Sequence, residues 1–367
     1  MNNFIELALA GVQQLVPYVP GKPVDELQRE LGLTEIVKLA SNENPLGTGR
    51  KVAAAIQAAL PELTRYPDGS GFALKTALSA HLDVTPAQIT LGNGSSEILE
   101  LMMRTFVAPE HEVVFSQHAF ALYPILTQAV GAKAKVVPAK QYGHDLTAMR
   151  AAINANTRLV FIANPNNPTG TLLATSELED FIASLPAQVL CVLDEAYFDF
   201  VAPDLRSDTM HWPLRYPNLI IARTFSKAHG LAGLRIGYGV SSIELADLLN
   251  RVRQPFNSNS LALAAAEAAL GDTEYLQQTV ATNNAGMLQL TQAFSHLGLQ
   301  WIPSSGNFVS VDVQQNGMAI YNALLQKGVI VRPVANYEMP NHIRVSIGTS
   351  QENKVFIDAL AQVLKGV

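Results

Sequence analysis

The middle of the chain alternates short apolar runs with helical stretches, and this alternation constrains the fold more than any other feature of the sequence. Stretches such as SSEILELMMRTF (95–106) and SELEDFIASL (176–185) have the period of a helix. Apolar, β-branched runs that alternate with such helices predict an α/β domain whose mostly parallel, seven-stranded sheet is covered on both faces. The predicted strands are QITLGNG (88–94), EVVFSQ (112–117), AKVVPA (134–139), RLVFIANP (158–165), QVLCVLDE (188–195), NLIIART (218–224) and RIGYGV (235–240).

We expect a second, smaller domain beside this one. The Pro/Gly-rich segment SNENPLGTG (41–49) leads into the large domain, and the stretch after RQPFNSNS (253–260) leads out of it, so we place the large domain at 46–254. The C-terminal part mixes strand-like runs with a final helix, which predicts an α+β domain over 255–367. Residues 1–45 are too few to fold alone and are expected to join it.

Composition narrows the possible partners. The chain has 367 residues, of which 48% are hydrophobic and 15% charged, and its net charge of −6 is spread without a basic stripe. Nucleic acid and anionic membranes are therefore not expected as partners. The start lacks a basic region of the kind that opens a secretory signal, so we expect a cytoplasmic protein. The single cysteine, Cys191, lies in the apolar run VLCVL and is expected to be a core residue.

Two groups of polar residues follow predicted strands, where ligands of such sheets bind. In ITLGNGSSEI, Ser95 and Ser96 open a helix after a glycine turn, and the free N–H groups of a helix start suit a phosphate. The glycines would also be explained by a tight turn alone. In FIANPNNPTG (161–170), Asn167 ends a proline-braced stretch of asparagines, for which a structural turn is again the alternative.

A third group ends the most apolar strand on Asp194 and Glu195, with Tyr197 two residues later. A buried carboxylate needs a cation or a hydrogen-bond donor, because leaving it unpaired is costly. A metal ion would be one answer, but the eight histidines show no spacing typical of metal ligands. We therefore expect no metal.

The fourth group surrounds Lys227, which follows the strand NLIIART. Thr224, Ser226 and Arg235 supply hydroxyls and a guanidinium, a combination that suits a phosphate. A desolvated lysine has a lowered pKa and acts as a nucleophile toward aldehydes. One ligand would satisfy all four groups, because pyridoxal 5′-phosphate carries a phosphate, a ring nitrogen, a ring oxygen and an aldehyde.

The chain also resembles a known family. The segments SNENPLG, RYPDG, GNGSSEI, NPNNPTG, DEAYFDF, FSKAHGLAGLRIGYG and HIRVSIGT occur in the order and spacing of the fold-type I, pyridoxal-phosphate-dependent aminotransferases. The set is most similar to the histidinol-phosphate aminotransferases of the class II subgroup, and it covers essentially the whole chain. The resemblance implies a fold-type I transferase that is active as a homodimer.

The resemblance implies the following roles at the cofactor. Lys227 would bond to the cofactor aldehyde and later shuttle the substrate proton, and Asp194 would keep the ring nitrogen protonated. Tyr197 and Asn167 would hydrogen-bond the ring oxygen. Tyr123, in FALYP, would stack on the ring, with a core aromatic as the alternative. The phosphate would be bound by Ser95, Ser96, Thr224, Ser226, Arg235 and, from the neighbouring subunit, Tyr66 of RYPDG.

The resemblance also implies the substrates. Tyr18, Asn44, Arg332 and Arg344 would bind them, the two arginines receiving the phosphate of L-histidinol phosphate or a carboxylate of glutamate. The alternative for the arginines is a pair of exposed ion pairs. The expected reaction transfers an amino group between L-histidinol phosphate and 2-oxoglutarate in histidine biosynthesis, giving imidazole-acetol phosphate and glutamate.

Three alternatives share this fold. An aromatic-amino-acid aminotransferase would use the same cofactor site. A threonine-phosphate decarboxylase would share the phosphate recognition but break the bond to the carboxylate. A regulator built on the fold would need an added basic module, for which we expect no room before residue 40.

Overall fold

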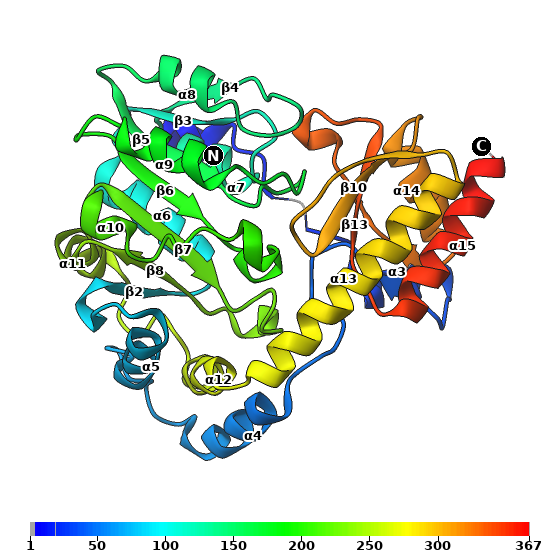
Figure 1. The fold of residues 1–367 in the computed structure, drawn as a ribbon, viewed down its shortest axis with the longest axis horizontal. Coiled ribbons are helices and arrows are strands. Elements are labelled where there is room, and N and C mark those ends of the chain that lie inside the picture. The colour runs from blue at the N-terminus through cyan, green and yellow to red at the C-terminus, as the bar shows by residue number, and fades with distance from the viewer. Residues whose placement is uncertain (1–3, 19, 367) are drawn as a thin grey trace.

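A seven-stranded sheet forms the centre of the larger of two structural units. The computed structural model describes residues 4–18 and 20–366 (Figure 1). The sheet has the order β2-β8-β7-β6-β5-β3-β4, and only β8 runs antiparallel to its neighbours. The predicted mostly parallel sheet of seven strands is thus confirmed. Its strands are β2 (Ile89–Gly92), β3 (Glu112–Ser116), β4 (Lys133–Val137), β5 (Thr157–Ala163), β6 (Leu190–Asp194), β7 (Leu219–Thr224) and β8 (Gly237–Ser241).

Helices cover both faces of this sheet because successive strand residues point to opposite sides. On β6, Leu193 packs into one apolar core with α5, α9 and α12, whereas Val192 packs into a second core with α6 and α11. This doubly covered sheet with its helices is called the large unit. Its helices are α4 (Arg50–Ala59), α5 (Phe72–Leu82), α6 (Ser95–Phe106), α7 (Leu122–Ala129), α8 (Leu146–Ala152), α9 (Thr175–Ala183), α10 (Trp212–Arg215), α11 (Ile243–Val252) and α12 (Ser260–Leu270).

A four-stranded antiparallel sheet forms the small unit, with the order β12-β13-β10-β9. Strands β1 and β11 form a separate parallel pair. A hydrophobic core distinct from those of the large unit lies between the strands and the helices of the small unit. The strands are β1 (Val37–Lys38), β9 (Gln300–Ile302), β10 (Phe308–Asp312), β11 (Val329–Ile330), β12 (Arg332–Pro333) and β13 (His342–Ser346), and the helices are α3 (Val24–Leu31), α13 (Thr273–His296), α14 (Gly317–Leu325) and α15 (Ser350–Gly366).

A long helix connects the two units. The long helix α13 runs from the large unit to the small one, as the yellow ribbon of Figure 1 shows. Helix α3 belongs to the small unit, because Leu27 packs against Ala40 and Ile330. Helix α12 lies beyond the predicted boundary at 254, yet Ala262 and Ala266 are fully buried in the core beside the large sheet. The division into two domains stays a prediction. Its boundary at 254 assigns α12 to the small domain, whereas α12 packs against the large sheet.

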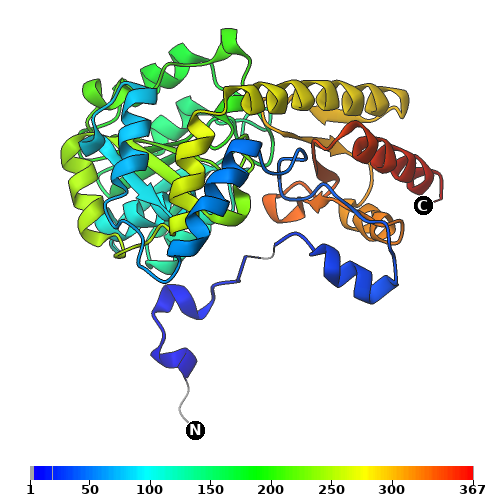
Figure 2. The ribbon, with the colours of Figure 1, turned by 90° about the horizontal axis from the view of Figure 1, so that it is seen from below.

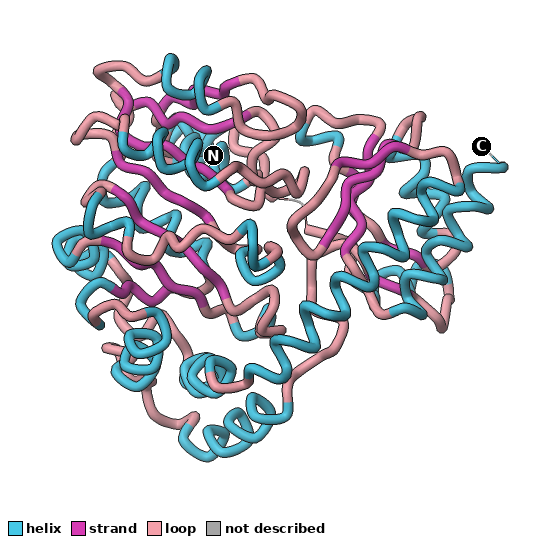
Figure 3. Tube along the Cα trace, in the orientation of Figure 1, coloured by secondary structure: helices cyan, strands magenta, loops and turns pink. Residues whose placement is uncertain are grey.

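The first described residues form two short helices, α1 (Phe4–Leu7) and α2 (Ala10–Gln13), of which α2 lies against α7 and α1 extends away from the body of the molecule (Figure 2). Long loops follow several strands of the large sheet on the side that faces the small unit (Figure 3). None of the helices described in 4–18 and 20–366 is both long and apolar enough to cross a membrane. The structure also contains short 3-10 helices, which are η1 (Leu60–Glu62), η2 (Pro86–Gln88), η3 (Phe198–Phe200), η4 (Pro203–Leu205), η5 (Ala232–Leu234) and η6 (Ala335–Tyr337).

Candidate active site

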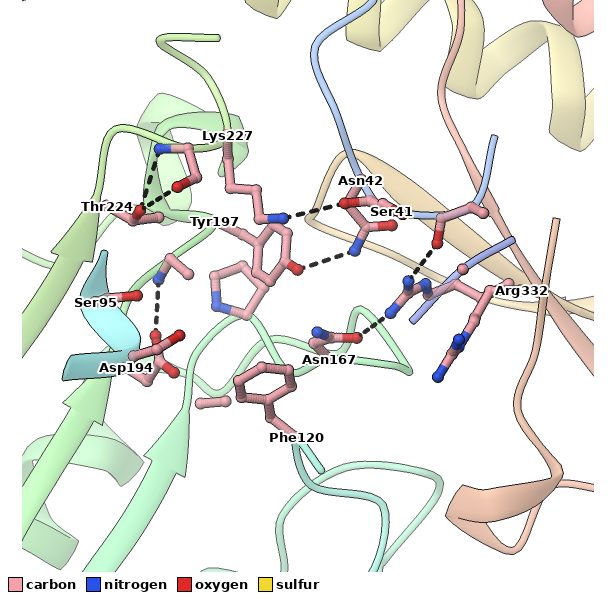
Figure 4. Close-up of a pocket in the computed structure, with 18 of the residues that line it drawn as sticks. Ser41, Asn42, Ser95, Phe120, Asn167, Asp194, Tyr197, Thr224, Lys227 and Arg332 are labelled. Carbon is pink, nitrogen blue, oxygen red and sulfur yellow. Dashed lines mark hydrogen bonds between the residues drawn. The ribbon is translucent and has the colours of Figure 1, made fainter. Parts of the chain in front are cut away.

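A cavity of about 860 Å³, counted to its open mouth, lies between the carboxyl ends of β5, β6 and β7 and the small unit (Figure 4). Both units contribute to its wall, so the cavity depends on their association. It is lined by Tyr18, Gly21, Ala40, Ser41, Asn42, Ser95, Ser96, Phe120, Ala163, Pro165, Asn167, Asp194, Ala196, Tyr197, Thr224, Ser226, Lys227, Arg235, Arg332 and Arg344.

One end of the cavity is built to receive an anion. Ser95 and Ser96 begin α6, and no side chain caps the free N–H groups of its first turn. Gly94 precedes them with φ of 79°, and a Cβ there would collide with the guanidinium of Arg235. A Cβ on Gly237 would likewise collide with the backbone nitrogen of Ser95. The two glycines therefore bring a helix start and a guanidinium together, an arrangement that suits a phosphate.

Hydroxyl groups complete this anion cradle. Arg235 Nη1 donates to Ser226 Oγ at 3.3 Å, and Thr224 Oγ1 lies 3.0 Å from the same oxygen. Arg235 has φ of 57°, a left-handed conformation that few residues other than glycine adopt. Such strain often accompanies functional sites. Five residues predicted from two separate motifs thus meet at one end of the cavity: Ser95, Ser96, Thr224, Ser226 and Arg235.

Lys227 projects into the centre of the cavity from the loop after β7 (Figure 4). Its Nζ donates to the carbonyl of Ser41 at 3.2 Å and lies 5.7 Å from the centre of the Tyr197 ring. Burial, assisted by the positive charge of Arg344, lowers the pKa of Lys227 from 10.5 to about 8. The neutral fraction of this amine near neutral pH is still a minority but far larger than that of an ordinary lysine, so the amine is available as a nucleophile.

Asp194 and Glu195 are adjacent in sequence but have different surroundings. Asp194 lines the cavity, where its carboxylate accepts hydrogen bonds from the Tyr123 hydroxyl at 3.0 Å and the Ala196 backbone N–H at 3.2 Å. Burial raises the pKa of Asp194 to about 6, so the group is largely a carboxylate at pH 7. Glu195 points away from the cavity and pairs with Arg223 at 2.8 Å, while accepting from Thr209.

Tyr197 and Asn167 face each other across the cavity floor, and each has a partner from outside the large unit (Figure 4). Asn42 Nδ2 donates to the Tyr197 hydroxyl at 2.9 Å. Arg344 Nη1 donates to Asn167 Oδ1 at 2.5 Å, so the NH₂ group of that amide is left for another acceptor. Burial raises the pKa of Tyr197 to about 12, which keeps its hydroxyl protonated.

Two buried arginines of the small unit line the opposite wall. Arg344 donates to the carbonyl of Ala40 as well as to Asn167, and Arg332 lies with its guanidinium carbon 5.4 Å from the centre of the Tyr18 ring. Within 4–18 and 20–366, neither arginine forms an ion pair with a carboxylate, so the alternative of exposed ion pairs does not apply. Buried cations without an acidic partner favour an anionic ligand.

Two of the predicted positions are wrong. Tyr123 is fully buried, and its ring stacks on Phe161 at 4.4 Å rather than facing the cavity. Phe120, three residues earlier, lines the cavity instead. Asn44 is not part of the wall, because its amide donates to Ala228 O and Thr279 Oγ1 behind the Lys227 loop.

Tyr66 does not reach the cavity of its own chain. Its side chain is 83% exposed and stacks on Phe256 at 4.7 Å. A surface aromatic pair of this size is available to a second protein molecule, so its predicted role in a neighbouring subunit's site stays a prediction.

Residue-based reasoning missed Ser41, Asn42 and Phe120. Ser41 contributes a backbone carbonyl, which no side-chain pattern reveals. Asn42 has φ of 53°, a conformation that asparagine tolerates, and it lies in the quoted segment SNENPLG, so its position carried a usable signal. The structure shows no group of three or more metal-binding side chains among the residues it describes.

Comparison with known proteins identifies the family. The model of "Aminotransferase class I and II" matches residues 34–360. The chain belongs to this aminotransferase family. Among curated relatives, histidinol-phosphate aminotransferase 2 of Pseudomonas fluorescens is 62% identical over 365 residues, covering 99% of each chain, and histidinol-phosphate aminotransferase 1 of Nitrosococcus oceani is 59% identical over 362 residues, covering 99% of this chain and 98% of that one.

A solved structure agrees with this assignment. The histidinol-phosphate aminotransferase of Sinorhizobium meliloti in complex with pyridoxal-5′-phosphate aligns with a TM-score of 0.91 and 30% identity over 97% of each chain. The fold-type I architecture of the class I and II aminotransferases is therefore confirmed for this chain.

The two adjacent carboxylates should respond differently to substitution. Glu195→Ala leaves the Arg223 guanidinium buried without its partner, so we expect the free energy of unfolding to fall by about 3–5 kcal/mol. Asp194→Asn preserves shape and polarity and should change that quantity by less than about 1 kcal/mol while removing most aminotransferase activity. Urea denaturation and activity assays on both variants test this. Similar destabilisation by the two substitutions would contradict the separation of roles.

Proposed function

We propose that the protein transfers an amino group between L-histidinol phosphate and 2-oxoglutarate, giving imidazole-acetol phosphate and glutamate, in histidine biosynthesis. The observation that carries this proposal is the pair of buried arginines, Arg332 and Arg344, that face the cavity without a carboxylate partner. The full-length relatives named histidinol-phosphate aminotransferase support the substrate. Both the phosphate of one substrate and a carboxylate of the other are suitable ligands for these guanidinium groups.

Pyridoxal 5′-phosphate fits the donor set of the cavity as the cofactor. The helix start at Ser95 and Ser96, with Thr224, Ser226 and Arg235, would hold the phosphate. Asp194 would hold the ring nitrogen, and Phe120 would cover one face of the ring. When bound, this cofactor supplies an aldehyde for the lysine and a ring that accepts electrons from the substrate.

Lys227 and Asp194 would carry the proton chemistry. The Lys227 amine, with its lowered pKa, would bond to the cofactor, and after displacement by the substrate amine it would take a proton from the substrate Cα as a general base. Asp194 is a carboxylate held in place by two donors, so it would keep a proton on the ring nitrogen. Tyr197 and the NH₂ group of Asn167 would donate to the ring oxygen.

The two substrates would share one anion site. Arg344 is held by hydrogen bonds to Asn167 and Ala40, and it would bind the phosphate of L-histidinol phosphate in one half-reaction and a carboxylate of glutamate or 2-oxoglutarate in the other. Arg332 lies beside the exposed Tyr18 ring, near the mouth, and would recognise the phosphate. Bidentate guanidinium contacts suit both a phosphate and a carboxylate, so one pair of residues serves both half-reactions.

We also propose that the protein acts in the cytoplasm as a homodimer whose subunits share their active sites. The exposed aromatic pair of Tyr66 and Phe256 is suited to contact a second subunit, where Tyr66 would reach the cofactor phosphate. Small-molecule amino donors and 2-oxo acids would be its only substrates. The named relatives do not favour an aromatic-amino-acid aminotransferase or a threonine-phosphate decarboxylase.

The choice of amino donor tests the proposed function. L-Histidinol phosphate and L-phenylalanine are added separately to the purified holoenzyme without an acceptor, and the visible band of the bound cofactor is followed. We expect faster conversion with L-histidinol phosphate at low concentration, and none in Lys227→Ala. A preference for phenylalanine would reassign the substrate, and a cofactor-saturated wild type without a visible band would reject the cofactor.

Substituting the two arginines should separate the donors. Arg332→Ala should raise KM for L-histidinol phosphate at least about tenfold, because it removes charged hydrogen bonds, and should affect phenylalanine less. Arg344→Ala should impair both donors. Arg251→Ala, which alters an exposed arginine paired with Asp247, is the matched control. Equal losses for every donor in both variants would contradict this division.

Cofactor uptake should depend on pH through Lys227. Only the neutral amine attacks an aldehyde, so the rate at which apoenzyme takes up pyridoxal 5′-phosphate should rise with pH and level off above about 8. Arg344→Ala should move the midpoint upward, because its positive charge helps to lower the Lys227 pKa. Stopped-flow absorbance measures the rate. A midpoint near the ordinary value of 10.5 would show that the amine is not perturbed.

A further inference from the structure

Asn42 connects the small unit to Tyr197 through buried hydrogen bonds. Asn42 is 1% exposed and Tyr197 is 4% exposed, and Asn42 Nδ2 donates to the Tyr197 hydroxyl at 2.9 Å (Figure 4). On its other side, the Asn42 backbone N–H donates to Ser346 Oγ at 2.7 Å, and Ser346 Oγ donates to Asn42 Oδ1 at 3.1 Å. Asn307 holds the Asn42 carbonyl at 3.0 Å. Asn42 is therefore constrained at its backbone and at both ends of its amide.

These contacts determine which way the Asn42 amide points. Ser346 Oγ accepts from the Asn42 backbone, so its own proton needs an acceptor, and Asn42 Oδ1 provides it. In the flipped amide the oxygen would face Tyr197 and the NH₂ group would face Ser346. The Ser346 proton would then lose its only acceptor within the described parts of the chain, at a cost of about 1–3 kcal/mol for a buried group. The NH₂ group of Asn42 is thus directed toward Tyr197.

A donor facing Tyr197 determines the direction of the phenolic proton. The Tyr197 oxygen accepts from Asn42, so its O–H points away from Asn42 and into the cavity. The same strand does this for Asn167, because Arg344 and Ser346 are two residues apart on β13 and lie on one face. Arg344 donates a hydrogen bond to the amide oxygen of Asn167, just as Ser346 donates one to the amide oxygen of Asn42. Two donors from the large unit are oriented by one strand of the small unit.

We propose that Asn42, oriented by Ser346, is a positioning residue that makes Tyr197 a hydrogen-bond donor toward the cofactor's ring oxygen. This inference rests on the proposed function, because the acceptor belongs to the cofactor. It assigns Asn42 a role through Tyr197 rather than contact with the reacting atoms. It also makes the donor strength of Tyr197 depend on the association of the two units.

Neutral substitutions test the inference without adding charge to the site. Asn42→Gly suits the φ of 53° at this position and removes the amide, while Ser346→Ala removes the group that orients it. Ser346→Thr keeps the hydroxyl and is the matched control. The charged and titratable groups that face Tyr197 are Lys227, Asp194, Arg344 and Tyr337, and all remain in these variants.

The measurement is the pH midpoint of the visible absorption change of the holoenzyme without substrate, together with the dissociation constant of the cofactor. A donor to the ring oxygen stabilises the form with the negative charge on that oxygen, so its loss raises the midpoint. We expect Asn42→Gly to raise it by about half a unit to one unit, and Ser346→Ala to raise it less. Ser346→Thr should retain the wild-type midpoint.

A double-mutant cycle separates positioning from a general structural effect. If Asn42 acts through Tyr197, Asn42→Gly should not shift the midpoint further in a Tyr197→Phe background. An undiminished shift in that background, or no shift in the single variant, would overturn the inference while leaving the proposed function in place. A wild-type holoenzyme without a titrating visible band would contradict the proposed function, and this inference with it.

Discussion

Positive charge concentrated around Lys227 is the constraint on which the rest of the site depends. Lys227, Arg235, Arg332 and Arg344 line the cavity, and among the residues that the structure describes Asp194 is the one carboxylate in its wall. Arg332 and Arg344 are buried without an acidic partner among the described residues, and an unpaired buried cation is costly, so the fold must hold these two groups by other contacts. Burial, assisted by the positive charge of Arg344, lowers the Lys227 pKa and makes the amine a nucleophile, while the guanidinium groups attract anions to both ends of the cavity. Arg344 therefore contributes both to activating the nucleophile and to recognising anions.

The architecture explains how these charges are brought together. The large sheet delivers Asp194 and the Lys227 loop from neighbouring parallel strands, and the small unit adds Arg332 and Arg344 from two paired strands. Neither unit alone forms the cavity. Adjacent residues also have different surroundings, because Asp194 faces the cavity whereas Glu195 is paired with Arg223.

Much of this was predictable from the residues. Apolar β-branched runs between helical stretches predicted the seven strands, because a strand buried on both faces needs apolar residues throughout. Polar residues after those runs predicted that Asp194, Lys227 and the residues of the anion cradle lie together, because strand ends converge at one edge of the sheet. Two errors have a common physical origin. Tyr123 and Asn44 lie within three residues of the side chains that line the wall, Phe120 and Asn42, and which residue of a loop or short helix faces a cavity depends on local backbone angles. Sequence spacing does not report those angles, nor the carbonyl of Ser41.

The most direct test of the charge-based account is a crystal structure of the Lys227→Ala protein with pyridoxal 5′-phosphate and L-histidinol phosphate. The account predicts the cofactor phosphate at the start of α6 beside Arg235, and the substrate phosphate within hydrogen-bond distance of Arg332 and Arg344. A substrate phosphate bound away from both arginines, or a cofactor phosphate bound by them, would contradict it.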